Sequence, residues 1–227
     1  NIKKTLLENG FEELLEGQVW KIETGKRYFV SRNNSSIIAL NLGTDLSNYS
    51  FNVAASHSDS PTFKLKENAE VEIKNHYVSL NTEGYGGMIC ASWLDRPLSI
   101  AGRVMVKDNN TYQTRLLCFD QDLVLIPNVS IHMNRSVNDG YAYNKQIDML
   151  PLIGGQAYQS GDLKKMIAKD LQVDVEDIYG SDLYFYNRMQ HTIWGAPDEF
   201  ISSPRLDDFQ CDYTSFHDFL TGHHSTT

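Results

Sequence analysis

The stretch VAASHSDSP at residues 53–61 places two metal-ligand residue types directly after an apolar run. His57 carries an imidazole, which in its neutral form is a good ligand for Zn²⁺ or Co²⁺. Asp59 follows two positions later, and in a strand such residues point to the same face, where a carboxylate can orient the imidazole. The alternative is a histidine at a strand end followed by a turn aspartate. The short motif alone favours that alternative.

A second stretch, FISSPRLDD at residues 200–208, repeats the pattern of an apolar run followed by acidic residues. The two oxygens of the Asp207 carboxylate can bridge two cations about 3.5–4 Å apart. Either aspartate can instead be the N-cap of a following helix, with Asp208 the better candidate for the cap. The ligand and cap roles are compatible.

The chain before the first stretch reads as one amphipathic helix followed by strands. Leucines and Phe11 recur at helical spacing over residues 6–15, and Gly17 is expected to end that helix. Period-two and apolar patterns then predict strands at 18–22, 26–31, 36–42 and 51–56. The last of these would deliver His57 at its carboxyl end, where open α/β sheets place their chemistry.

The chain between the two stretches has a different texture. Short strands are predicted at 69–73, 77–80, 98–106, 114–119, 123–126 and 182–188, with one helix at 162–170. A further helix begins near Tyr213, with Phe216, Phe219 and Leu220 on one side. The stretches with ligand chemistry therefore flank a β-rich block, which indicates one domain inserted into another. We expect a first domain segment at 1–66, an inserted domain at 67–198, and a return at 199–227.

Composition excludes several classes of function. Twenty Lys and Arg against 29 Asp and Glu give a net charge of −9, so the chain lacks the basic face of a nucleic-acid binder. No apolar run reaches the roughly 20 residues of a membrane helix, and no membrane partner is expected. The three cysteines are widely spaced without a CxxC pair, which disfavours disulfides and a thiolate zinc site and indicates a cytoplasmic protein.

Further motifs add a resemblance to a known family. The motifs that carry it are ASHSDSP at 55–61, YGGM at 85–88, WLDRPLSIAGRV at 93–104, IPN at 126–128, IHMNR at 131–135, NKQ at 144–146, MLPL at 149–152, YNR at 186–188, WGA at 194–196 and RLDD at 205–208. With these motifs, over most of the chain from about residue 28, the sequence resembles the metallo-aminopeptidases of the aspartyl aminopeptidase type, which include the yeast-type vacuolar aminopeptidase.

The resemblance implies a fold and an activity. The fold is α/β: a metallopeptidase domain interrupted by an inserted β-rich dimerisation domain. The activity is metal-dependent hydrolysis of N-terminal residues from peptides, through a water activated by two divalent metal ions. Zinc is expected, with cobalt or manganese as alternatives. The implied assembly is a homo-oligomer built from dimers, with a dodecamer as the candidate size.

The resemblance also implies roles for particular residues. His57 and Asp207 are implied metal ligands, with Asp207 bridging the two metals, and Asp59 is the implied catalytic acidic residue that orients His57. His132 matches a histidine that contacts substrate in the family; a buried histidine bonded within a sheet is the equal alternative. Asp95 and Arg96, in the densest motif, are interpreted as a structural ion pair or interface contact.

The resemblance leaves part of the site unaccounted for. Family members carry paired glutamates, a further aspartate and a late histidine after the Arg-Leu-Asp segment, and none of these occurs in the 227 residues. The adjacent His223 and His224 diverge by about 100° on a helix and are not expected to replace them. A second hypothesis is therefore a catalytically inactive, truncated piece that acts as an oligomerisation scaffold.

Overall fold

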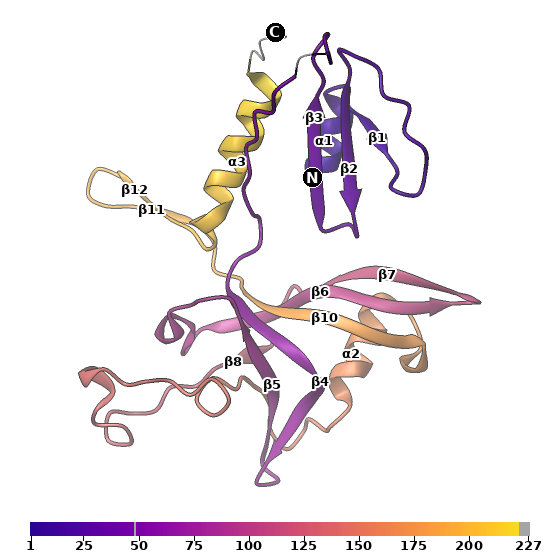
Figure 1. Cartoon of the computed structure of the whole chain (residues 1–227). Coiled ribbons are helices and arrows are strands. Elements are labelled where there is room, and N and C mark those ends of the chain that lie inside the picture. Colours follow the sequence, from indigo (N-terminus) through magenta and orange to yellow (C-terminus); the bar gives the residue numbers. More distant parts are fainter. Residues whose placement is uncertain (48, 223–227) are drawn as a thin grey trace. The chain divides into compact units, whose positions relative to one another are not determined.

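The computed structural model describes residues 1–47 and 49–222, a mixed α/β chain with more strand than helix (Figure 1). This confirms the predicted fold class. The chain divides into two compact units, Asn1–Ser58 with Asp207 onward, and Asp59–Leu206. The predicted boundaries at 66/67 and 198/199, and the domain roles attached to them, remain predictions. His223 and His224 lie outside the described residues.

The first unit contains a three-stranded sheet and two helices. Its elements are α1 (Ile2–Glu8), β1 (Glu12–Leu14), β2 (Arg27–Arg32), β3 (Ser36–Asn41) and α3 (Leu206–Thr221). The sheet order is β1-β2-β3, with β1 parallel and β3 antiparallel to β2. The hairpin predicted at 26–42 is therefore confirmed as β2 and β3.

The first helix is shorter than predicted because Gly10 stops it. Gly10 adopts a φ of +79°, a left-handed conformation that costs glycine little. The Phe11 amide donates to the Leu6 carbonyl and the Gly10 amide to the Leu7 carbonyl, both at 3.1 Å. This is a Schellman motif, in which Phe11 turns back onto Leu6. The helix predicted over 6–15 is thus wrong beyond Asn9, and residues 12–14 form β1 instead.

Two other predicted strands do not form. Residues 18–22 and 51–56 have no regular secondary structure in the described chain. Val19 is 94% exposed and Phe51 81% exposed, so their apolar side chains do not lie on a buried sheet face. An apolar run predicts a strand only where a neighbouring strand pairs with it, and neither segment has one among the described residues. His57 is therefore not presented by a strand end.

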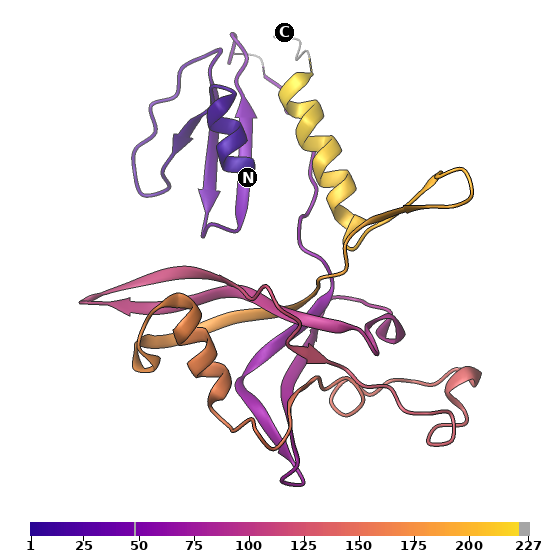
Figure 2. The ribbon, with the colours of Figure 1, turned by 180° about the vertical axis from the view of Figure 1, so that it is seen from behind.

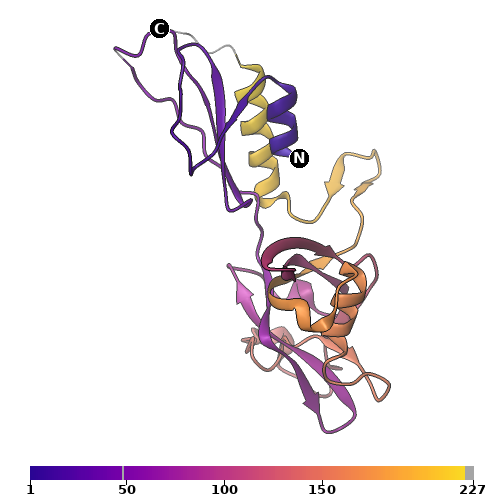
Figure 3. The same ribbon diagram turned by 90° about the vertical axis from the view of Figure 1, so that its right-hand side faces the viewer.

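Both helices of this unit pack on one face of its sheet (Figure 3). Leu6, Phe11 and Phe29 form the buried centre, and the rings of Phe11 and Phe219 lie 5.7 Å apart. The predicted apolar side of α3 is confirmed, because Phe216, Phe219 and Leu220 pack against this centre. The helix begins at Leu206 rather than near Tyr213, with non-helical backbone angles at its second and third residues.

The second unit is dominated by a seven-stranded sheet with the order β10-β4-β5-β9-β8-β6-β7. Its strands are β4 (Thr62–Ile73), β5 (Tyr77–Tyr85), β6 (Pro97–Asp108), β7 (Thr111–Cys118), β8 (Val124–Leu125), β9 (Leu152–Gly154) and β10 (Ile178–Asn187). Of these, only β9 was not predicted. β10 pairs with β4 and also with β6, so the sheet closes on itself. This closure pairs main-chain N–H and C=O groups that the edge strands of an open sheet would expose.

The closed sheet surrounds a continuous apolar core. Phe63, Leu80, Ile100 and Leu98 are at most 1% exposed within it. At Gly102 the paired strands β6 and β10 approach so closely that a Cβ atom would collide with the main-chain carbonyl oxygen of Asp182. A glycine is therefore required where the closing pair of strands meets.

The helix α2 (Asp162–Leu171) lies against the closed sheet (Figure 2) and covers part of its core. A carboxylate from another element caps it. Glu70 of β4 accepts hydrogen bonds from the Gly161 amide at 2.6 Å, the Leu163 amide at 3.2 Å, and the Tyr158 hydroxyl at 2.6 Å. Burial of the Tyr158 hydroxyl raises its pKa, and the hydrogen bond to Glu70 raises it further. These bonds satisfy amides that the first turn of a helix leaves unpaired.

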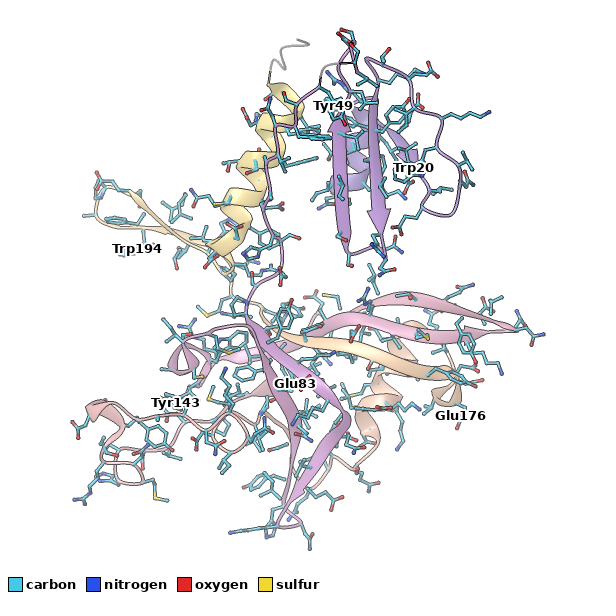
Figure 4. All side chains as sticks on the ribbon, in the orientation of Figure 1. Trp20, Tyr49, Glu83, Tyr143, Glu176 and Trp194 are labelled. Carbon is cyan, nitrogen blue, oxygen red and sulfur yellow. The ribbon has the colours of Figure 1, made fainter. Side chains whose placement is uncertain are left out.

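A small hairpin of this unit leaves its apolar residues in solvent. Within residues 1–47 and 49–222, β11 (Thr192–Trp194) and β12 (Phe200–Ser202) form a separate two-stranded sheet, and the rings of Trp194 and Phe200 lie 4.9 Å apart. Trp194, labelled in Figure 4, is 53% exposed, and Ile193 and Ile201 are more exposed. The remaining short elements are 3-10 helices at Cys90–Trp93, Val137–Asp139 and Val175–Asp177.

We predict that Glu70→Ala lowers the free energy of unfolding by about 2 kcal/mol, because it leaves partly buried donors at the start of α2 unpaired. Glu72→Ala is the matched control, since Glu72 is exposed on the same strand. It should change stability by less than about 0.5 kcal/mol. Urea denaturation followed by circular dichroism measures both. Equal effects of the two variants would show that Glu70 does not cap α2.

Candidate metal centre

His57 lies in a segment without helix or strand and contacts the start of α3. Its Nε2 atom lies 3.7 Å from the Oδ2 atom of Asp208, and its main-chain amide donates to the same oxygen at 3.4 Å. One residue earlier, the Ser56 hydroxyl donates to Asp212 Oδ1 at 3.1 Å. The first turns of α3 thus hold the segment that carries His57.

Asp208 is the more buried partner of this pair. Its side chain is 19% exposed, against 58% for His57. The Cys211 thiol hydrogen-bonds to the carboxylate and lowers the pKa of Asp208; the His57 amide and ring lower it further, against the opposing effect of burial. The same bond raises the pKa of Cys211. Asp208 is therefore an anion at neutral pH, and the Cys211 thiol remains protonated.

Asp207 lies at the entrance to α3 with extended backbone angles, φ −88° and ψ 111°, and a cis peptide bond joins it to Asp208. The described residues contain no group of three or more His, Cys, Asp or Glu side chains arranged to hold a metal ion. The roles of His57 and Asp207 as ligands therefore remain predictions.

Asp59 belongs to the second unit, where it is held by a tyrosine. The Tyr85 hydroxyl, at the end of β5, donates to Asp59 Oδ2 at 2.6 Å. This hydrogen bond, with the negative charge of Asp59, raises the pKa of Tyr85. The expectation that His57 and Asp59 share the face of a strand is wrong, because residues 57–59 have no strand geometry.

His132 lies in an exposed turn of the long connection between β8 and β9. The alternative of a buried histidine bonded within a sheet is therefore wrong. The connection is tied internally, because Asp148 accepts bonds from the Asn144 amide at 2.7 Å and the Tyr141 hydroxyl at 3.1 Å. Tyr143 of the same connection is labelled in Figure 4. A substrate role for His132 stays a prediction.

Asp95 and Arg96 make contacts with other residues of the second unit, and their interpretation as an ion pair or an interface contact stays a prediction. Asp95 Oδ1 accepts the Asn128 amide at 2.8 Å, and the Asp95 amide donates to the Ile126 carbonyl at 2.9 Å. The Arg96 guanidinium lies 3.7 Å from the Met189 sulfur. The motif therefore joins the chain before β6 to the end of β8.

Sequence reasoning missed the residues that support the candidate site. Tyr85 falls in a quoted motif, but a tyrosine among glycines does not indicate which carboxylate it will contact. Asp208 was identified only as a cap. Asp212 and Cys211 gave one available signal: they lie four and three residues after Asp208, which places all three near one another on a helix.

Comparison with known proteins assigns the family. A family model described as aminopeptidase I zinc metalloprotease (M18) matches residues 1–227. The chain therefore belongs to the M18 family of aminopeptidases.

Individual relatives agree with this assignment. A probable M18 family aminopeptidase 2 of Clostridium acetobutylicum is 44% identical over 216 residues, which is 92% of this chain and 50% of the relative. Aspartyl aminopeptidase 4 of Saccharomyces cerevisiae is 34% identical over 247 residues, covering 96% of this chain and 50% of its own length. The chain spans about half the length of the curated relatives it matches.

Solved structures show the same fold. A chain in a cryo-EM structure of the Ape4 and Nbr1 complex gives a TM-score of 0.87 at 32% identity, over 97% of this chain and 46% of that chain. The mApe1 of Chaetomium thermophilum gives 0.82 at 28% identity, over 100% and 55%. A dodecamer of S. cerevisiae mApe1 gives 0.75 at 23% identity over 96% and 50%, a likeness of fold alone.

The donor types in the first unit fit the zinc that the family name implies. Zinc takes imidazole nitrogen and carboxylate oxygen, and the first unit brings the imidazole of His57 to the start of α3, where Asp207 and Asp208 stand in succession. The fit is limited to donor chemistry. A catalytic zinc takes three protein ligands, and the described residues bring no such group of three together.

We predict that Asp59→Asn lowers the pKa of Tyr85 toward the ordinary tyrosine value of about 10. The carboxylate stabilises the protonated phenol by accepting its hydrogen bond and by its charge, and the amide supplies no charge. NMR titration of isotope-labelled tyrosine rings measures the shift. Asp139→Asn, at an exposed aspartate of the same unit, should leave Tyr85 unchanged. An unaltered Tyr85 in Asp59→Asn would contradict the contact.

Proposed function

We propose that the full-length protein is a metal-dependent aminopeptidase that removes N-terminal residues from peptides. The observation that carries the proposal is the match of the M18 zinc metalloprotease family over residues 1–227. The scaffold hypothesis, a catalytically inactive piece, is not favoured by this match.

Two divalent metal ions, most simply zinc, would be held in part by His57 and Asp207. Bound zinc polarises a carbonyl group and lowers the pKa of a water molecule. Within the first unit, the start of α3 holds the segment that carries His57. Within the second unit, the Tyr85 hydroxyl donates a hydrogen bond to Asp59, whose proposed role is to orient a ligand or attract the substrate's positively charged α-amine.

His132 is the proposed substrate contact outside the metal centre. Its exposure on a turn leaves the imidazole accessible to a peptide. The preferred N-terminal residue, acidic or neutral, is decided by assaying the full-length protein against Asp-, Glu- and Leu-linked chromogenic amides.

We also propose that the active form is a homo-oligomer built from dimers. The exposed apolar side chains of the β11–β12 hairpin support this, because such surface is costly to leave in water. The three free cysteines support a reducing compartment such as the cytoplasm. No helix among the described residues is long and apolar enough to cross a membrane.

We predict that His57→Ala in the full-length protein lowers the bound zinc and abolishes peptidase activity, because it removes a metal ligand. Metal analysis and a chromogenic peptidase assay measure the two effects. His191→Ala is the matched control, since His191 is an exposed histidine directly before β11. Wild-type activity in His57→Ala would refute the role of His57.

Chelation gives a second test of the proposal. EDTA should silence hydrolysis by the full-length protein, and added Zn²⁺, Co²⁺ or Mn²⁺ should restore it, because each of these ions can act as the Lewis acid. The measurement is the rate before chelation, after it, and after each metal is added back. Turnover that is insensitive to the chelator would exclude a metal-dependent mechanism.

A further inference from the structure

In the described part of the chain, the segment that carries His57 has no regular secondary structure and little buried apolar surface. It belongs to no helix or strand, so no ladder of main-chain hydrogen bonds fixes its backbone. The apolar residues before it, Phe51 and Val53, are more than 80% exposed, so core packing does not anchor it either. The position of His57 must therefore depend on contacts made by particular side chains.

The start of α3 supplies such contacts. Asp208 accepts the main-chain amide of His57 at 3.4 Å, which is longer than the usual N–H···O distance of about 2.7–3.2 Å, and faces the imidazole at 3.7 Å. Asp212, one helical turn later, accepts the Ser56 hydroxyl at 3.1 Å. Two successive residues of the irregular segment are therefore held by two carboxylates of one helix.

Asp208 is itself held in place. Its side chain is only 19% exposed, so the carboxylate has little freedom to rotate away from His57. A carboxylate held beside a histidine in this way can orient it as a metal ligand.

The geometry distinguishes this role from direct ligation. The Oδ2 atom that faces the imidazole is the same atom that accepts the His57 amide. A cation placed between Oδ2 and Nε2 would lie beside the partly positive hydrogen of that amide, which repels it. The main-chain bond therefore favours a positioning role for Asp208 over a role as the ligand itself.

We infer that Asp208 is a positioning residue that fixes His57 for metal binding by accepting its main-chain amide. The inference rests on the proposed function for its biological purpose, but the positioning itself is a property of the metal-free protein. Since an amide oxygen also accepts a hydrogen bond, Asn should replace Asp208 in this role, whereas Ala should not.

The test compares Asp208→Ala and Asp208→Asn in the full-length protein, with Asp218→Ala as the control. Asp218 is an exposed aspartate of the same helix, so it matches the loss of charge. Hydrogen–deuterium exchange of peptides covering residues 53–61, in metal-free protein, reports on the His57 amide. Zinc affinity is measured separately by competition with a chromophoric chelator.

We expect Asp208→Ala to speed exchange at residues 53–61 by about tenfold. It should weaken zinc binding by about 10- to 100-fold. Asp208→Asn should stay close to the wild-type protein in both measurements, and Asp218→Ala should change neither.

Two results would overturn the inference. One is exchange unchanged in Asp208→Ala, which would mean that the segment is held by something else. The other is equal loss of zinc affinity in Asp208→Asn and Asp208→Ala with exchange altered only in the latter, which would make the carboxylate a ligand. If wild-type protein binds no zinc, the proposed function fails, while exchange still decides whether Asp208 positions His57.

Discussion

The pairing of β10 with both β4 and β6 is the constraint on which the larger unit depends. Without it the strands would form an open sheet with two long edges. With it, they close around one apolar core that includes Phe63, Ile100 and Leu183. The long strand β6 pairs along most of its length with β10 on one side and β7 on the other. It therefore sets the register of both neighbours.

The smaller unit depends on a different constraint, because residues from the two ends of the chain form its core. Phe11 near the start and Phe219 near the finish meet over a three-stranded sheet. The same helix that completes this core turns its first residues toward His57. Core packing at one end of α3 thus places the carboxylates at its other end, which connects the stability of the unit to the geometry of the candidate site.

Patterns with a local cause were predictable from the sequence. The β2–β3 hairpin, most strands of the closed sheet, and α2 follow from periodicity and turn residues. Predictions failed where a single residue or a missing neighbour decided the outcome: Gly10 ended α1 early, and residues 51–56 found no strand to pair with. The candidate site shows the same division. His57 and Asp207 were recognisable by residue type and motif, whereas the contacts of Asp208 and Tyr85 depend on chain return that no local pattern encodes.

Gly102 has a genetic consequence. The carbonyl of Asp182 occupies the space that any side chain at position 102 would need. Every missense change at this codon, even to alanine, therefore disturbs the pairing of β6 with β10 that closes the sheet. Such alleles would lose the protein through misassembly and clearance by the cell's quality control rather than through damaged chemistry. The protein would then be lost although Gly102 lies in a different unit from His57 and the candidate site itself is unchanged.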